Sequence, residues 1–180
     1  MTIFLSILRG INVSGQKKVP MAELKSLYEE LNLKNITTYI QSGNVIFKNQ
    51  NAKDLSQKIE KKIFEKYNFN VPVIIRTTNE MQVLINENPF LKEKNIDPDK
   101  LHITYLAENP KQENIENLKK YNYQPDRFFI SGKEVYLFCP NGYGSTKLTT
   151  NFFENKLKVP ASTRNWRTTN ELLKIMKSYK

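Results

Sequence analysis

The chain has 180 residues with 28 basic and 18 acidic side chains, a length that allows one or two small domains and excludes a large multidomain enzyme. Hydrophobic residues make up 39% and aromatic residues 11%, so the chain can bury a core and is not an intrinsically disordered one. With one cysteine and one histidine it has no internal disulfide and no Cys/His zinc or iron–sulfur site, and we expect no metal and no cofactor.

The first half of the chain is predicted to run strand, helix, strand, strand, helix, strand. The four strands are the apolar or β-branched segments 2–8, 36–40, 45–47 and 71–75. Apolar residues at helical spacing predict helices over 21–31, opened by Pro20, and over 55–67. Thr77 and Glu80 form a capping box for a short helix that follows.

The second half repeats this order after a polar segment, 86–100, that contains two prolines. Its predicted strands are 103–106, 127–130, 135–138 and a short one near 159–163. One helix opens at Pro110, and another carries Leu148, Phe152 and Leu157. The final helix has Thr168 and Glu171 as its capping box.

This order predicts an α+β fold of two ferredoxin-like (α/β-plait) subdomains with antiparallel sheets, plus a C-terminal helix. The first subdomain with its trailing short helix takes residues 1–88, the linker 89–100, and the second subdomain with the C-terminal helix 101–180. No close internal sequence repeat accompanies the repeated order.

The positive charge is concentrated toward the C-terminus. The net charge is +10, and residues 141–180 hold 8 basic and 2 acidic groups. Clustered cations favour a nucleic acid or nucleotide as partner, although the abundance of lysine and asparagine also fits a purely compositional bias. Because no apolar run reaches the ~20 residues of a membrane span and no leader precedes the first strand, we expect a cytoplasmic protein without membrane contact.

Polar side chains gather at two edges of the predicted sheets. In a plait the first and second strands run the same way, so the loop after one lies beside the turn after the other. The residues expected to meet at the first edge are Arg9, Asn12, Gln41, Ser42 and Asn44. They suit stabilisation of a phosphate or an oxyanion, but Asn, Ser and Gly also serve turns by default.

The second edge combines the segments 141–147 and 164–167. Glycines 142 and 144 precede a predicted helix, so a nest of backbone N–H groups with Ser145 and Lys147 could hold an anion; the alternative is Ser145 as an ordinary N-cap. The spacing is not that of a Walker A motif. The other segment is Arg164, Asn165, Trp166 and Arg167. It suits phosphate binding with base stacking, unless Trp166 packs in the core and the arginines cap carbonyls.

Other reactive side chains have simpler interpretations. His102 stands at the start of a predicted strand with no acid or nucleophile beside it in the sequence. Cys139 is predicted to be a small, buried apolar residue. Asp97 and Asp99 flank Pro98 in an ordinary turn. No matched general base, nucleophile or metal cluster is visible, so the catalytic residues of any enzyme activity stay unassigned.

Several motifs resemble the bacterial domain-of-unknown-function family 1697. The motifs are Leu8-Arg9-Gly10-Ile11-Asn12-Val13-Ser14-Gly15, Val19-Pro20-Met21, Tyr39-Ile40-Gln41-Ser42-Gly43-Asn44-Val45, Ser145-Thr146-Lys147-Leu148 and Thr163-Arg164-Asn165-Trp166. The resemblance covers nearly the whole chain. It implies a pair of α/β-plait subdomains and supplies no activity, cofactor or catalytic residue.

Three functions therefore remain open. The favoured hypothesis is a module that binds a phosphate-bearing ligand, nucleic acid or nucleotide, through the basic edge of Lys147, Arg164, Trp166 and Arg167. An enzyme of unknown reaction would use the first edge. A protein–protein interaction module would use an exposed sheet edge.

Overall fold

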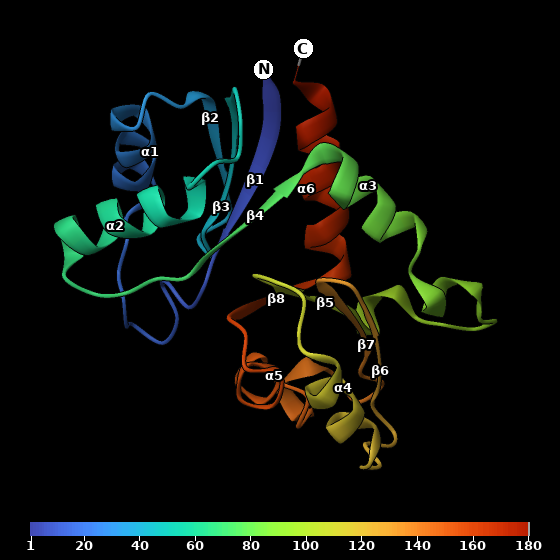
Figure 1. The fold of residues 1–180 in the computed structure, drawn as a ribbon. Helices are drawn as coiled ribbons and strands as arrows, with labels where there is room; N and C mark the ends of the chain where they lie inside the picture. Colours follow the sequence, from blue (N-terminus) through green and yellow to red (C-terminus); the bar gives the residue numbers. More distant parts are fainter. Residues whose placement is uncertain (180) are drawn as a thin grey trace. The chain divides into compact units, whose positions relative to one another are not determined.

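The structure is a computed structural model that describes residues 1–179. Its strands form two four-stranded antiparallel sheets, which confirms the predicted α+β class (Figure 1). The chain divides into two compact units, Met1–Gln82 with the segment from Leu172 onward, and Val83–Glu171. The boundaries that the sequence suggested for independently folding parts, 1–88, 89–100 and 101–180, stay a prediction.

The first sheet has the strand order of a ferredoxin-like plait, β2-β3-β1-β4. Every neighbouring pair is antiparallel, so β1 and β2 run in the same direction on either side of β3. The elements are β1 (Thr2–Leu8), α1 (Met21–Glu30), β2 (Lys34–Tyr39), β3 (Asn44–Asn49), α2 (Leu55–Tyr67), β4 (Val73–Thr77) and α3 (Thr78–Asn86).

Both faces of the first sheet are buried. Strand residues alternate between faces, and Phe4 and Leu8 join the core beneath α1 and α2, which lie on one side of the sheet in Figure 1. Leu5 and Ile7 point the other way and are equally buried. The end of the chain belongs to this unit, and the Tyr179 hydroxyl donates to the Ile46 carbonyl oxygen at 3.3 Å.

The second sheet repeats the topology in the order β6-β7-β5-β8. Its elements are η1 (Pro89–Lys92), η2 (Pro98–Lys100), β5 (Leu101–Leu106), α4 (Gln112–Lys119), β6 (Arg127–Ser131), β7 (Glu134–Phe138), η3 (Tyr143–Ser145), α5 (Thr150–Leu157), β8 (Ala161–Asn165) and α6 (Trp166–Ser178), where η marks a 3-10 helix. The last strand therefore lies two residues later than the predicted segment 159–163.

The second sheet is also covered on both faces. Leu106, Val135 and Leu137 face α4 and α5 and form an apolar core with them. On the opposite face the Tyr136 hydroxyl donates to the Leu84 carbonyl oxygen, and the Tyr105 hydroxyl donates to Thr169, both at 3.1 Å. These hydroxyls let large aromatic side chains be fully buried without leaving a polar atom unsatisfied.

The helix starts confirm one predicted cap and correct two. Glu80 accepts from the Thr77 amide at 2.7 Å, and Thr77 Oγ1 accepts from the Glu80 amide at 3.2 Å, which is the predicted capping box. The box predicted at Thr168 and Glu171 is wrong, because α6 begins at Trp166 and Asn165 Oδ1 accepts from the Thr168 amide at 2.7 Å.

The helix α5 begins after the glycine-rich segment has ended. Thr149 caps it by accepting from the Phe152 amide at 3.2 Å, so the suggestion that Ser145 is its N-cap is wrong. The glycines lie instead around η3, where Gly142 takes a φ of 89°.

A short sequence match marks equivalent positions of the two plaits. Val71-Pro72 and Val159-Pro160 each precede the last strand of their sheet, and Arg76 and Arg164 each stand next to the strand's last residue. In both units the proline carbonyl oxygen accepts, at 2.9 Å, from the amide that follows the first strand. The arginines also match, since each donates from Nη1 to the preceding residue's carbonyl oxygen at 2.9 Å.

Gly43, in the turn after β2, is the glycine with the least space around its Cα. It has a φ of 78°, and a Cβ there would lie 2.7 Å from Leu8 Cβ and 2.8 Å from Ile11 Cδ1.

We predict that Gly43→Ala lowers the free energy of unfolding by about 2–4 kcal/mol, because backbone strain and overpacking add. Gly10→Ala is the matched control: its φ is 70° but the space around it is open, so a loss of about 1 kcal/mol is expected. Urea unfolding measures both, and equal losses would contradict the close contact.

Candidate functional site

The first polar edge forms where the loop after β1 meets the turn after β2. Asn12 Nδ2 donates to the Gln41 carbonyl oxygen at 2.9 Å, and the Leu8 amide donates to the Gly43 carbonyl oxygen at 2.8 Å. The structure thus brings together the two segments that the sequence placed at one edge. The half-buried Arg9 belongs to the same loop, and its amide donates to the Pro72 carbonyl oxygen.

The side chain of Asn12 holds this loop together through hydrogen bonds. Its backbone is left-handed, with a φ of 55°, a conformation that asparagine tolerates better than most residues. Besides the bond to Gln41, Nδ2 donates to the Val19 carbonyl oxygen at 3.0 Å, and Oδ1 accepts from the Val19 amide at 2.8 Å. Its amide group is therefore occupied in holding the loop closed from residue 12 to residue 19.

Asn44 and Ser42 hold the neighbouring turn. Asn44 is fully buried, and its Nδ2 donates to the Tyr39 carbonyl oxygen at 3.2 Å and to Ser42 Oγ at 3.0 Å. These contacts are those of a turn-stabilising residue, the alternative that the sequence left open. Gln41 differs, because its side chain is exposed.

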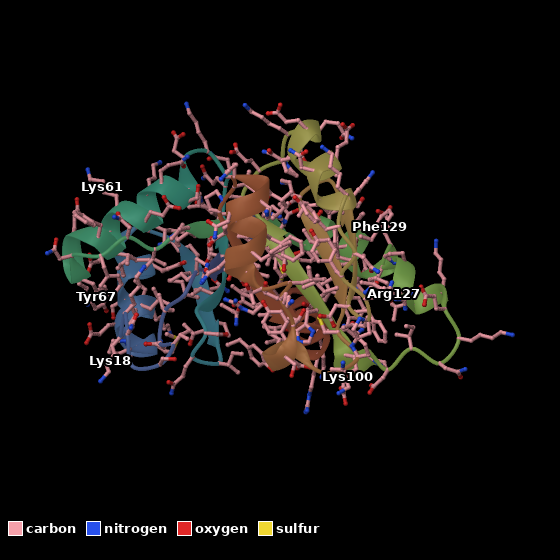
Figure 2. The ribbon with its side chains drawn as sticks, turned by 90° about the horizontal axis from the view of Figure 1, so that it is seen from below. Lys18, Lys61, Tyr67, Lys100, Arg127 and Phe129 are labelled. Atoms are coloured by element: carbon pink, nitrogen blue, oxygen red, sulfur yellow. The ribbon has the colours of Figure 1, made fainter. Side chains whose placement is uncertain are left out.

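A pocket of 540 Å³ opens between this loop and the start of α1. The lining residues are Asn12, Gly15, Lys18, Val19, Pro20, Met21, Ala22 and Gln41. Pro20 precedes the helix and provides no side-chain cap, so the first-turn amides lack the partner that Ser, Thr, Asn or Asp would supply. Lys18 is exposed at the rim (Figure 2).

The acidic residue in the first turn of α1 is engaged elsewhere. Glu23 accepts from the Tyr67 hydroxyl at 2.8 Å and pairs with Lys66 at 3.1 Å. The hydrogen bond from Tyr67, with that from Lys66, holds the pKa of the Glu23 carboxyl below its usual value. Its negative charge is thereby directed toward α2.

The second polar edge gathers Ser145 and Lys147 around a smaller cavity of 220 Å³ that Asp126 and Asn141 also line. Thr146, which lies between them, is buried; its Oγ1 donates to Asp126 Oδ2 at 2.6 Å and accepts from the Leu148 amide at 3.0 Å. These bonds fix the segment before α5 begins.

The segment 164–167 alternates between buried and exposed side chains. Arg164 and Trp166 are each only 8% exposed, whereas Asn165 and Arg167 are exposed. Arg164 Nη1 donates to Ser162 Oγ and to the Thr163 carbonyl oxygen, both at 2.9 Å. Because β8 runs directly into α6, the chain has no loop in which all four side chains could turn toward solvent.

A series of hydroxyl groups connects Tyr143, in the segment 141–147, with Thr163, next to the segment 164–167. The sequence alone did not indicate this connection. Thr163 Oγ1 lies 2.7 Å from Thr104 Oγ1 and 2.8 Å from Thr150 Oγ1, and Thr150 Oγ1 lies 3.4 Å from the Tyr143 hydroxyl. The ring of Tyr143 stacks on that of His102 with centroids 4.7 Å apart. Thr104 and Thr163 are cross-strand partners on β5 and β8, but no local sequence pattern links them to Tyr143 and Thr150.

Burial shifts the pKa values of His102 and Cys139. His102 is 9% exposed, its Nδ1 has no hydrogen-bond partner within the described chain, and burial lowers its pKa although the nearby Lys100 backbone acts in the opposite direction. Burial raises the pKa of the Cys139 thiol to about 11, so the thiolate needed of a nucleophile is disfavoured at neutral pH.

No group of three or more His, Cys, Asp and Glu side chains within residues 1–179 is arranged to hold a metal ion. None of the helices in this part of the chain has both the length and the apolar character required to cross a membrane.

Known proteins match the chain in family and in fold. The family described as "Protein of unknown function (DUF1697)" matches residues 1–136. Among solved structures, the conserved bacterial protein SP0830 from Streptococcus pneumoniae is similar, with 21% sequence identity and a TM-score of 0.78. That match covers 97% of this chain and 98% of the other, and at this identity it shows the fold alone. No curated protein matches the sequence.

The neighbouring arginines 164 and 167 are predicted to differ in their effect on stability. Arg164→Ala should lower the free energy of unfolding by about 2–4 kcal/mol, because it removes a buried, hydrogen-bonded side chain. Arg167→Ala should change it by less than about 0.5 kcal/mol, because that side chain is exposed. Thermal and urea unfolding test the pair; equal small effects would mean that Arg164 is not held in the interior.

The only histidine offers a direct test of burial at the second edge. Proton NMR should follow the single imidazole to a pKa below the usual value near 6.5, with desolvation as the cause. By linkage, the stability due to His102 is fully present above about pH 6.5 and is lost as the pH falls toward its lower folded pKa. A pKa at or above the usual value would contradict the buried, neutral ring.

Proposed function

We propose that the chain, which belongs to the family of proteins of unknown function DUF1697, binds a phosphate-bearing ligand at the pocket before α1. The observation that carries the proposal is the uncapped first turn of α1, which borders a pocket that Lys18 and Gln41 also line. Catalytic residues remain unassigned, and the proposed role is binding.

The chemistry of the pocket suits an anion with several oxygen atoms. Backbone N–H groups in the first turn of a helix carry partial positive charge, and without a capping side chain they can donate to a ligand. Lys18 adds a full charge, and the exposed amide of Gln41 adds a donor. The engagement of Glu23 by Tyr67 and Lys66 keeps a competing carboxylate directed away.

The size of the pocket favours a nucleotide or another small phosphorylated molecule. A volume of 540 Å³ lies within the range of about 300–1,000 Å³ that small-molecule sites occupy. Gly15, which has open space around its Cα, adds no side chain that would narrow the entrance.

Burial favours this first edge over the basic second edge that the sequence suggested. A phosphate site at 164–167 would need Arg164 and Trp166 at the surface, but both are nearly covered, and Asn165 is used as a helix cap. An enzyme at the first edge has little support from Asn12, because its amide is already bonded to Val19 and Gln41.

The proposal is tested by two charge reversals that change the net charge equally. Lys18→Glu should weaken the binding of ADP, measured by isothermal titration calorimetry, by at least about tenfold, because it places a carboxylate at the pocket rim. Lys58→Glu on α2, also an exposed lysine, should change it by less than about twofold.

Inorganic pyrophosphate, AMP and a short single-stranded RNA serve as comparison ligands. Binding of ADP that both variants weaken equally would indicate a general response to charge and contradict a site at α1. The absence of heat with every phosphate-bearing ligand of this panel would contradict the proposed function.

A further inference from the structure

The equivalent outer strands β2 and β6 differ in how well they are protected against pairing with another strand. β2 is interrupted by a register shift between Lys34 and Thr37, and Asn35 has a left-handed φ of 52°. Such irregularities prevent an additional strand from joining an edge. β6 pairs with β7 over all five of its residues without a shift and lies at the end of its sheet. Its edge is therefore regular.

The turn after β6 determines which backbone groups point outward. Ser131 and Glu134 face each other across the two-residue turn of Gly132 and Lys133, so they form the hydrogen-bonded pair that closes the hairpin. Alternation then directs the N–H and C=O groups of Phe128 and Ile130 away from β7. Within the described residues, β6 has no other strand neighbour, and these groups are available to a strand added alongside.

Aromatic side chains line a groove of 390 Å³ along this edge. Tyr121 and Tyr123 contribute from the connection that follows α4, and Phe90 and Phe129 contribute from the opposite face of the sheet. Tyr121 is 61% exposed and Phe129 is 51% exposed, and Phe129 lies at the periphery in Figure 2. Exposed aromatic rings on both sides of a free strand edge would contact alternate side chains of an added strand.

The acidic side chains of the groove are paired, whereas cations lie on the side of Tyr121. The groove's two acidic side chains are engaged, since Glu93 accepts two hydrogen bonds from Arg127, at 2.8 and 3.0 Å, and Asp126 accepts from Thr146. The cation beside Tyr121 is Lys156, whose Nζ lies 5.6 Å from the ring centroid, and the exposed Lys119 and Lys120 precede Tyr121 in the chain. The groove therefore complements an acidic ligand on the side of Tyr121.

We propose that β6 binds an extended segment of a partner protein as an added strand, with acidic residues alternating with apolar ones. The acidic side chains face Tyr121 and the lysines near it, and the apolar side chains face Phe129. Main-chain hydrogen bonds to Phe128 and Ile130 supply affinity, and the alternating contacts supply specificity. This surface belongs to Val83–Glu171 and does not depend on the phosphate pocket.

The probe is a fluorescein-labelled peptide of about ten residues in which glutamate alternates with valine. Anisotropy should show saturable binding at least about tenfold tighter than that of a peptide with lysine in place of glutamate, and binding should weaken between about 50 and about 200 mM salt. Phe129→Lys should weaken binding by at least about tenfold. Phe64→Lys on α2 is the matched control, because Phe64 is 45% exposed, and it should leave binding unchanged.

Amide hydrogen exchange tests the strand pairing independently of the variants. With the glutamate–valine peptide bound, the Phe128 and Ile130 amides should exchange at least about tenfold more slowly. No saturable binding, a preference for the lysine peptide, equal loss in both variants or unchanged exchange at these amides would each overturn the proposal. A dimer of the chain alone that protects the same amides would assign the edge to a second copy and overturn it too.

Discussion

The close approach of Gly43 to Leu8 and Ile11 is the contact on which the first edge depends. The Leu8 amide donates to the Gly43 carbonyl oxygen, and a residue with a Cβ at position 43 would collide with both side chains. This approach sets the turn after β2 against the loop after β1, where Asn12 joins the Gln41 carbonyl oxygen to Val19. Because the loop is fixed in this way, Lys18 and Pro20 lie with Gln41 around the pocket at the start of α1.

The two plaits use the same backbone plan with different side chains at the edges. Leu8 and Leu106 end equivalent strands, and each donates from its amide across to the neighbouring hairpin. The residue that follows is Arg9 in the first unit and Ala107 in the second. The second unit has a two-residue turn, Gly132 and Lys133, where the first has the longer turn of Ile40 to Gly43. The shared fold therefore leaves room for a different role at each edge.

Much of the fold could be predicted from the sequence because apolar periodicity is local. The apolar run in 2–8 and the helical spacing in 55–67 predicted β1 and α2 without reference to the rest of the chain. The cap at Thr77 and Glu80 was predictable for the same reason. The start of α5 could not be predicted, because Gly142 and Gly144 resemble the residues that precede a helix. In the structure Thr146 bonds to Asp126, which is distant in sequence, and α5 begins only at Thr150.

The candidate site could be predicted only in part, because burial is a tertiary property. The topology placed Asn12 beside Gln41 correctly. The same reasoning left open whether Arg164 and Trp166 bind a ligand at the surface or pack in the interior, and the structure buries both where a strand runs directly into a helix. The repeated pattern of Val-Pro followed by an arginine near the strand end, at Arg76 and Arg164, was the available warning, since a basic residue at equivalent positions of two plaits indicates a structural role.

The proposed phosphate site before α1 is tested most directly by amide chemical shifts. Titration of nitrogen-15-labelled protein with ADP should move the amide resonances of Lys18, Met21, Ala22 and Gln41 most, because these groups line the pocket before α1. Shifts concentrated instead at Lys147 and over residues 164–167 would contradict the account and return the site to the basic second edge.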